Sequence, residues 1–199
     1  MTRLLGSVTF WTFDTEYDPI GKFVEDDTYT FGFANNHGEK HFFDKPRDVW
    51  RFLIKKRFRR LYVWCMNPEF GSLCSWHIIR APRDELGKFA YVSEEGSVAP
   101  YHFRIPRRDK WTTVYDIQGF FKNSRWKGIR LASLSNMAKF LAQFYNDPTI
   151  YKPESPELMK FLGKRKPRSQ AEWDLLHKRV TQDAYVTAKA VQYLECDLM

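Results

Sequence analysis

An apolar run near the start of the chain ends in two acidic residues, and this feature constrains the fold most. In "FWTFDTEYDP" (10–19), aromatic residues lead into Asp14 and Glu16. A buried carboxylate costs free energy unless a cation or hydrogen-bond donors pair with it. Residues i and i+2 of a strand point to the same face, so both acids must share one environment. Either "EYDP" begins a turn in solvent, or the strand ends in a site that supplies a cation.

The rest of the chain alternates between strand and helix patterns. Strands are expected at 4–16, 28–34, 41–44 and 60–66, and helices at 46–58, 68–77, 130–144 and 169–198. Ser169 stands where the last helix would begin, with Glu172 at capping-box spacing. In residues 78–113, stretches of alternating apolar and polar residues are separated by turn residues, which predicts an inserted β-hairpin. We therefore expect a single α/β domain over residues 1–199.

The charge of the chain favours a polyanionic partner. Lys and Arg total 32 against 24 Asp and Glu, a net charge of +8. The basic residues cluster at 55–60, 104–110 and 160–168, as on a nucleic-acid-binding face, although a solvated surface is the plain alternative. The three cysteines fit neither a disulfide framework nor a zinc site, which favours a reducing, cytoplasmic location. No apolar run is long enough to span a membrane, so we expect no membrane association.

A third acid could join the first two. Hard divalent cations such as Mg²⁺ or Mn²⁺ prefer clustered carboxylate oxygens. Asp183 lies between Val180 and Ala184 in the last expected helix, at the margin of its apolar face. An acid at that margin is either a surface residue or a partner for Asp14 and Glu16.

The order of these motifs resembles the 3′–5′ exonuclease domain of family B DNA polymerases of the protein-primed type. "FDTE" matches the first motif, and a late helix carries D-A-x-x-T from Asp183 onward. Between them, "YVWCMNPEFGSL" (62–73) resembles the second motif. "VYDIQGFF" (114–121) and "LASLSNMAKF" (131–140) resemble the later strand and the helix after it. The resemblance covers nearly the whole chain in order and spacing, with few identical residues.

The resemblance implies an RNase H-like fold of the DnaQ type, a mixed sheet flanked by helices with a β-hairpin insertion. It also implies hydrolysis with two divalent ions, Mg²⁺ or Mn²⁺, held by four carboxylates. Asp14 would bridge the ions, and Glu16 and Asp183 would complete the shell of one of them. The implied partner is DNA with a single-stranded 3′ end, together with replication proteins. A viral or plasmid origin would fit this role.

Two positions depart from the family pattern. Gly71 stands where the second motif carries its acid, and Glu69 or Asp116 is the candidate substitute. Arg179 stands where the third motif carries a Tyr. His177 is not expected to replace that Tyr, because six residues place it roughly 120° around the helix from Asp183.

Nucleic-acid contacts are implied at residues of the second motif, of the last helix and of the loop at 146–156: Asn67, Phe70, Arg179, Tyr151 and Lys152. Lys152 in "YKPE" corresponds loosely to a catalytic Lys of the family, and a surface Lys is the alternative. The sequence thus predicts a metal-dependent 3′–5′ DNA exonuclease, weakened if the missing acid is not replaced. The alternative is a degenerate exonuclease fold that binds nucleic acid or serves as a replication-complex subunit.

Overall fold

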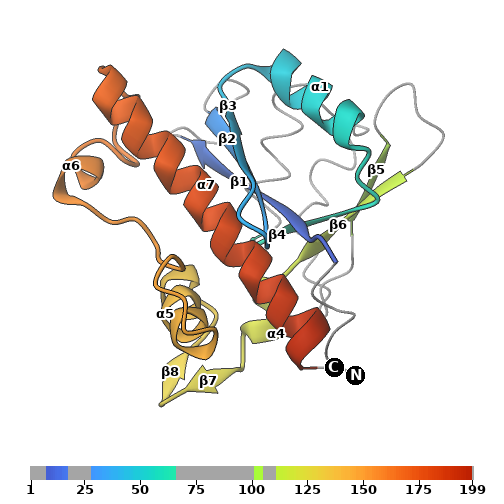
Figure 1. Ribbon diagram of the computed structural model, residues 1–199. Helices are drawn as coiled ribbons and strands as arrows, with labels where there is room; N and C mark the ends of the chain where they lie inside the picture. The colour runs from blue at the N-terminus through green and yellow to red at the C-terminus, as the bar shows by residue number, and fades with distance from the viewer. Residues whose placement is uncertain (1–7, 18–27, 66–100, 105–110, 199) are drawn as a thin grey trace, which may run out of the picture.

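A mixed six-stranded sheet forms the centre of the protein. The computed structural model describes residues 8–17, 28–65, 101–104 and 111–198 (Figure 1). The strands stand in the order β3-β2-β1-β4-β6-β5. Strands β1, β4 and β6 run parallel, whereas β2, β3 and β5 pair antiparallel with their neighbours. Their bounds are Trp11–Tyr17 (β1), Thr28–Asn35 (β2), Lys40–Phe43 (β3), Arg60–Val63 (β4), Tyr101–Arg104 (β5) and Trp111–Asp116 (β6).

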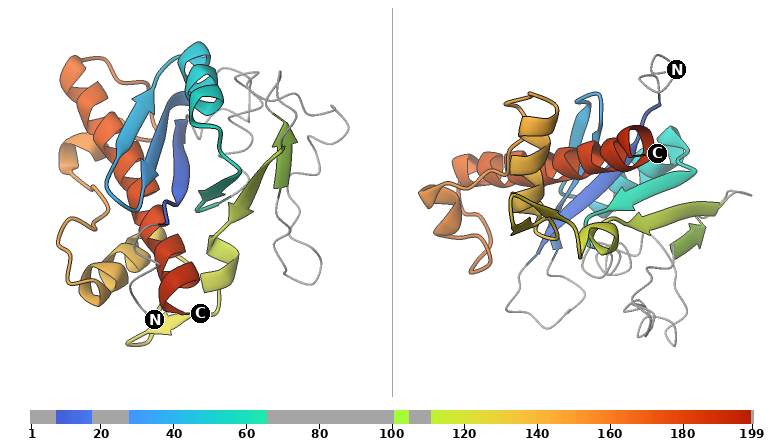
Figure 2. Two further views of the ribbon diagram at one scale, coloured as in Figure 1. Left: turned by 45° about the vertical axis from the view of Figure 1, so that its right-hand side comes forward. Right: turned by 90° about the horizontal axis from the view of Figure 1, so that it is seen from below.

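Helices cover both faces of the sheet, as the sequence predicted (Figure 2). Helix α1 (Pro46–Lys56) packs on the face that carries Phe31 and Phe33. Helix α7 (Gln170–Gln192) crosses the opposite face, which carries Ala34. Phe33 and Ala34 point to opposite faces because successive residues of a strand alternate. Helix α5 (Leu134–Phe144) packs alongside α7 and encloses it further.

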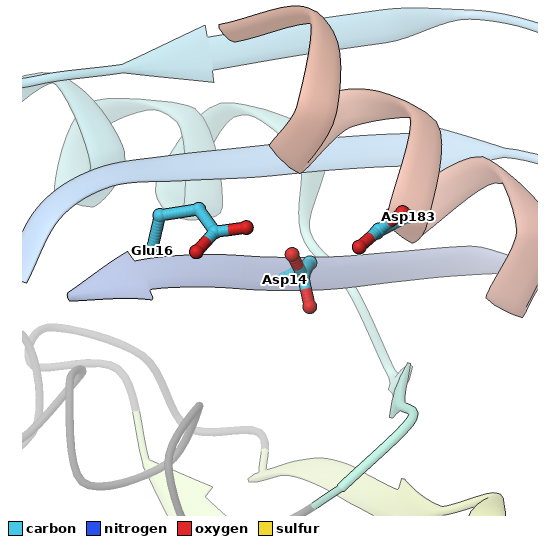
Figure 3. A group of neighbouring side chains, drawn as sticks. All are labelled: Asp14, Glu16 and Asp183. Atoms are coloured by element: carbon cyan, nitrogen blue, oxygen red, sulfur yellow. The ribbon is translucent and has the colours of Figure 1, made fainter. Parts of the chain in front are cut away.

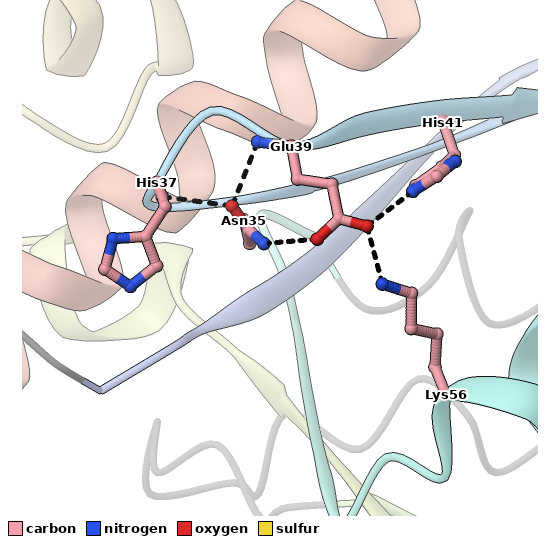
Figure 4. A network of polar contacts seen from close by, with 5 residues as sticks. All are labelled: Asn35, His37, Glu39, His41 and Lys56. Carbon is pink, nitrogen blue, oxygen red and sulfur yellow. Dashed lines mark hydrogen bonds and ion pairs between the residues drawn. The ribbon is translucent and has the colours of Figure 1, made fainter.

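A polar network holds the turn between β2 and β3 (Figure 4). The side-chain oxygen of Asn35 accepts hydrogen bonds from the backbone N–H groups of His37 and Glu39, at 3.0 and 3.1 Å. Lys56 Nζ, at the end of α1, lies 2.5 Å from Glu39 Oε1. The turn between β2 and β3 is therefore tied to the helix that follows it in the chain.

Some helix ends agree with the sequence patterns and others differ from them. The hydroxyl of Ser169 accepts a hydrogen bond from the backbone N–H of Glu172 at 3.2 Å, which confirms the predicted N-cap of α7. Helix α7 ends at Gln192 in a π-helical turn, Tyr193–Asp197. The helix expected at 130–144 begins only at Leu134, because a short ribbon precedes it. That ribbon pairs β7 (Arg125–Trp126) with β8 (Ile129–Arg130).

Two short helices complete the fold, α4 (Gln118–Phe121) and α6 (Pro156–Met159). Strands β5 and β6 form an antiparallel pair at the sheet edge, within and just beyond the predicted hairpin region at 78–113. The remainder of that region and the helix expected at 68–77 lie outside the described residues. None of the described helices has the length and apolar character needed to cross a membrane.

Candidate metal centre

Strand β1 presents its acidic residues to the face covered by α7. In the β1–β2 register, Asp14 stands opposite Gly32 and Glu16 opposite Thr30. Thr12 shares this face, because it precedes Asp14 by two residues. Its hydroxyl donates a 2.5 Å hydrogen bond to the backbone carbonyl of Ala184 in α7. This hydrogen bond thus joins β1 to α7 two residues before Asp14 on the same face of the sheet.

Gly32 allows the backbone of α7 to approach the sheet closely. A Cβ atom at this position would lie 2.6 Å from the carbonyl carbon of Val180 and 2.8 Å from the nitrogen of Thr181. These distances are far inside van der Waals contact, so only glycine fits here without a shift of the helix. Asp183 follows Val180 by nearly one helical turn and therefore comes down beside Asp14.

Three carboxylates meet as a result (Figure 3). One oxygen from each of Asp14, Glu16 and Asp183 lies within 4.8 Å of the others. Asp183 is 3% exposed and Asp14 is 9% exposed. Across the described part of the chain, this is the single group of three or more His, Cys, Asp or Glu residues with that spacing. Hard divalent cations such as Mg²⁺ and Mn²⁺ bind oxygen sets of this kind.

Two basic side chains also enter the cluster. Arg179 Nε lies 2.7 Å from Asp183 Oδ2 and 3.5 Å from Glu16 Oε1. Arg179 Nη1 donates a 2.6 Å hydrogen bond to the carbonyl of Pro153, and the residue is only 8% exposed. Lys152 Nζ lies 3.7 Å from the same Oδ2 atom. Arg179 therefore serves as an internal counter-ion to these carboxylates.

The two carboxylate oxygens of Asp183 have different surroundings. Oδ2 faces Arg179 and Lys152. Oδ1 is buried and has no hydrogen-bond partner among the described residues. A buried acceptor without a partner is costly, and a bound cation would satisfy it. The unpartnered oxygen and the all-carboxylate donor set both fit a divalent metal ion.

Burial changes the acidity of the cluster. It raises the pKa of Glu16 to about 7, against the opposing charge of Arg179 and with a further contribution from Asp183. Burial likewise raises the pKa of Asp183, against the opposing charges of Arg179 and Lys152. Without a metal, the cluster therefore retains a proton near neutral pH. A divalent ion would release that proton on binding, because its ligands must be deprotonated.

Asp116 is not brought to the three carboxylates. It ends β6 in register with Val63, and it shares the sheet face of Val114, which packs in the core under α1. Its Oδ1 atom accepts a hydrogen bond from the backbone N–H of Gly119 at 3.3 Å. The structure thus places this candidate substitute for the missing acid on the face of the sheet away from Asp14.

His177 also faces away from the cluster, as its position on the helix predicted. Its Nε2 atom lies 2.9 Å from both carboxylate oxygens of Asp44. Its ring stacks on Phe42 with centroids 3.8 Å apart. His177 therefore anchors α7 to the end of β3.

The remaining predicted residues of the site, which are nucleic-acid contacts and the candidate metal ligand Glu69, divide into two groups. Asn67, Glu69 and Phe70 lie outside the described residues. Tyr151 is 40% exposed, and Lys178 Nζ lies 5.8 Å from the centre of its ring. This aromatic–basic pair adjoins Lys152, whose amino group reaches the carboxylates.

Sequence reasoning missed the two residues that seat α7 on the sheet, Thr12 and Gly32. A glycine inside a strand pattern is a recognised signal of close backbone approach. A threonine hydroxyl in an apolar run, such as that of Thr12, is a weaker signal of such contact, because a single nearby carbonyl can satisfy it. Neither signal says which distant segment will approach.

The sheet order and the helices on both faces define a mixed α/β fold that is also found in a family B DNA polymerase. Family B DNA polymerases are among the solved structures that the chain resembles. The polymerase of the hyperthermophilic archaeon Pyrobaculum calidifontis aligns with a TM-score of 0.54 and 13% identity, over 94% of this chain and 24% of its own. At this identity the likeness concerns the fold.

Two structures of phi29 DNA polymerase align more loosely. The complex with primer-template DNA and incoming nucleotides has a TM-score of 0.48 and 14% identity, over 92% of this chain and 30% of its own. The complex with single-stranded DNA has a TM-score of 0.48 and 13% identity, over 96% and 32%. The chain thus spans a third or less of each polymerase. No protein-family model and no curated protein matches the sequence.

Proposed function

We propose that the chain is a metal-dependent 3′–5′ exonuclease acting on DNA. Asp14, Glu16 and Asp183 would hold Mg²⁺ or Mn²⁺, which supplies an activated water and Lewis-acid stabilisation of the phosphate. The observation that carries the proposal is the meeting of three carboxylates, one of which has a buried oxygen, Asp183 Oδ1, without a hydrogen-bond partner among the described residues. A site of this chemistry, on the fold of a family B polymerase region, suits phosphodiester hydrolysis.

The neighbouring residues would bind and orient the substrate. Lys152, whose amino group reaches the cluster, would place a positive charge beside the terminal phosphodiester. Tyr151 is exposed on the same loop and would stack on an unpaired base at the 3′ end. The net charge of +8 supports binding to the DNA backbone. The 3′–5′ polarity and the preference for DNA rest on the family resemblance.

A second candidate function is favoured by one specific observation. Arg179 occupies the position of the family's Tyr and fills part of the carboxylate cluster with a resident cation. Gly71 stands where the family carries a fourth acid. A site changed in both ways could bind nucleic acid without cleaving it. The chain would then be a nucleic-acid-binding module or a subunit of a replication complex.

A nuclease assay separates the two functions. Single-stranded DNA labelled at its 5′ end, incubated with the protein and Mn²⁺, should yield a ladder of products shortened from the 3′ end. Asp14→Asn and Asp183→Asn should abolish the ladder. Asp174→Asn changes an exposed acid of the same helix and should leave it intact. An RNA oligonucleotide of equal length tests the preference for DNA.

The outcome is decided at a protein concentration where a gel-shift assay shows all DNA bound. Absence of shortened products under that condition would exclude the exonuclease and support the binding module. Cleavage that survives Asp14→Asn would place the active site elsewhere. Release of the 5′ label as a mononucleotide before any ladder forms would contradict the proposed polarity.

A further inference from the structure

The guanidinium of Arg179 is fixed within the carboxylate cluster at two sides. Nε contacts Asp183 Oδ2 at 2.7 Å and Glu16 Oε1 at 3.5 Å. Nη1 donates to the carbonyl of Pro153, which lies in a different segment of the chain. The residue is 8% exposed, so solvent does not compete for these contacts. A planar group held by two segments keeps its position with little freedom to rotate away.

The charges of the cluster leave room for one divalent ion. Once deprotonated, as metal binding requires, the three carboxylates carry three negative charges, and Arg179 and Lys152 carry two positive charges, which leaves one negative charge. One divalent ion would bring the site to a single positive charge, matched by one phosphodiester. Two divalent ions would leave three positive charges in a largely buried space. Like charges repel strongly there, because the surroundings screen them less than water does.

The carboxylate oxygens that are available as ligands also indicate a single divalent ion. Asp183 Oδ2 is already engaged by Arg179, and the space between this atom and Glu16 Oε1 holds the guanidinium. Asp183 Oδ1 is the buried oxygen without a partner among the described residues. Asp183 Oδ1 therefore remains available to one ion, whereas the second position is taken by the Arg179 side chain.

We propose that Arg179 permanently replaces one of the two divalent ions, so that the site binds a single ion. The inference rests on the metal site of the proposed function, but it does not require that the site cleaves DNA. Arg179 is thereby a residue that sets the number of ions. The two-ion arrangement implied by the family resemblance is changed to one divalent ion plus one guanidinium.

Mn²⁺ titration of the full chain without DNA tests this directly. Isothermal titration calorimetry, with free Mn²⁺ measured by electron paramagnetic resonance, should give one ion per chain for the wild type. Arg179→Met removes the cation and offers no metal ligand, so it should raise the number to two. Arg179→Lys restores the charge and should return it to one. Lys178→Gln removes the same charge from the exposed neighbouring residue and should leave it at one.

Each alternative result overturns the proposal. Two ions on the wild type would show that Arg179 does not occupy a metal position, and one ion on the Met variant would show that its removal opens none. If the wild type bound no ion, the proposal that the cluster is a metal site would itself be refuted. Circular dichroism is used to check that each variant is folded. If Arg179→Met does not fold, Arg179→Gln takes its place in the titration.

The proposed function is judged separately with the nuclease assay. A single bound ion without DNA cleavage would leave the inference standing and exclude the exonuclease. DNA cleavage by a wild type that binds two ions would support the exonuclease and overturn the inference. The two proposals therefore fail in distinguishable ways.

Discussion

Replacing Gly32 by Ala should push α7 away from the sheet and weaken the proposed metal site. The added Cβ would meet three backbone atoms of α7, at 2.6, 2.7 and 2.8 Å, and backbone cannot rotate out of the way. Ordinary contact begins near 3.4 Å, so the helix must retreat by roughly 0.8 Å at this point. Overpacking of this kind costs about 1–3 kcal/mol, which a typical domain survives.

The retreat matters more for metal binding than for folding. Asp183 would move away from Asp14 by a similar distance, because both α7 and β1 are rigid elements and Asp14 stands opposite Gly32. Metal–ligand distances tolerate only about 0.2 Å, so we expect Mn²⁺ affinity to fall at least about tenfold. Urea denaturation followed by tryptophan fluorescence measures stability, and calorimetry measures Mn²⁺ binding.

Gly38→Ala is the matched control. Gly38 has φ of +89° and nothing within 4 Å of the added Cβ, so the substitution strains the backbone without moving α7. It should cost about 1–2 kcal/mol and leave Mn²⁺ binding unchanged. If Gly32→Ala also bound Mn²⁺ with wild-type affinity, close approach of α7 would not be what assembles the carboxylates.

Three further predictions concern single side chains around the site. Thr12→Val removes the hydrogen bond to Ala184 and should lower the free energy of unfolding by about 1 kcal/mol in urea denaturation; an unchanged midpoint would show that the bond contributes nothing. The raised pKa of Glu16 means that metal-free wild type loses stability as pH rises from 4.5 to about 7. The melting temperature of Glu16→Gln should not show this fall between pH 4.5 and 7. The prediction would be refuted if the melting temperatures of variant and wild type changed in parallel with pH. His177→Gln breaks the pair with Asp44 and should lower the melting temperature while Mn²⁺ affinity persists; loss of binding instead would give His177 a role at the metal centre.

The local elements could be predicted because their signals are local. Alternation over 28–34 predicted β2, and the capping-box spacing of Ser169 and Glu172 predicted the start of α7. The ribbon around Lys127 and Gly128 was missed. Its turn needs positive φ at both residues, 47° and 79°, and Lys is an unusual choice for the first of them.

The partners within the site were less predictable than its acids. Asp14 and Glu16 were identified because a carboxylate at the end of an apolar run costs free energy unless a cation or hydrogen-bond donors pair with it. Arg179 was predicted only as a nucleic-acid contact. Its ion pairs with Asp183 and Glu16 depend on the rotation of α7 against β1, which no spacing along the chain specifies.

The sequence by itself predicted most of the helices and strands, and it singled out Asp14 and Glu16 as carboxylates that require a partner. Period-2 and period-3.6 patterns and caps act within a few residues, and the pleat alone puts Asp14 and Glu16 on one face. The tertiary structure decided that Asp183 joins them and that Asp116 does not. The reason is physical: a glycine on β2 lets α7 approach one face of the sheet to backbone contact, and only residues on that face can share the site.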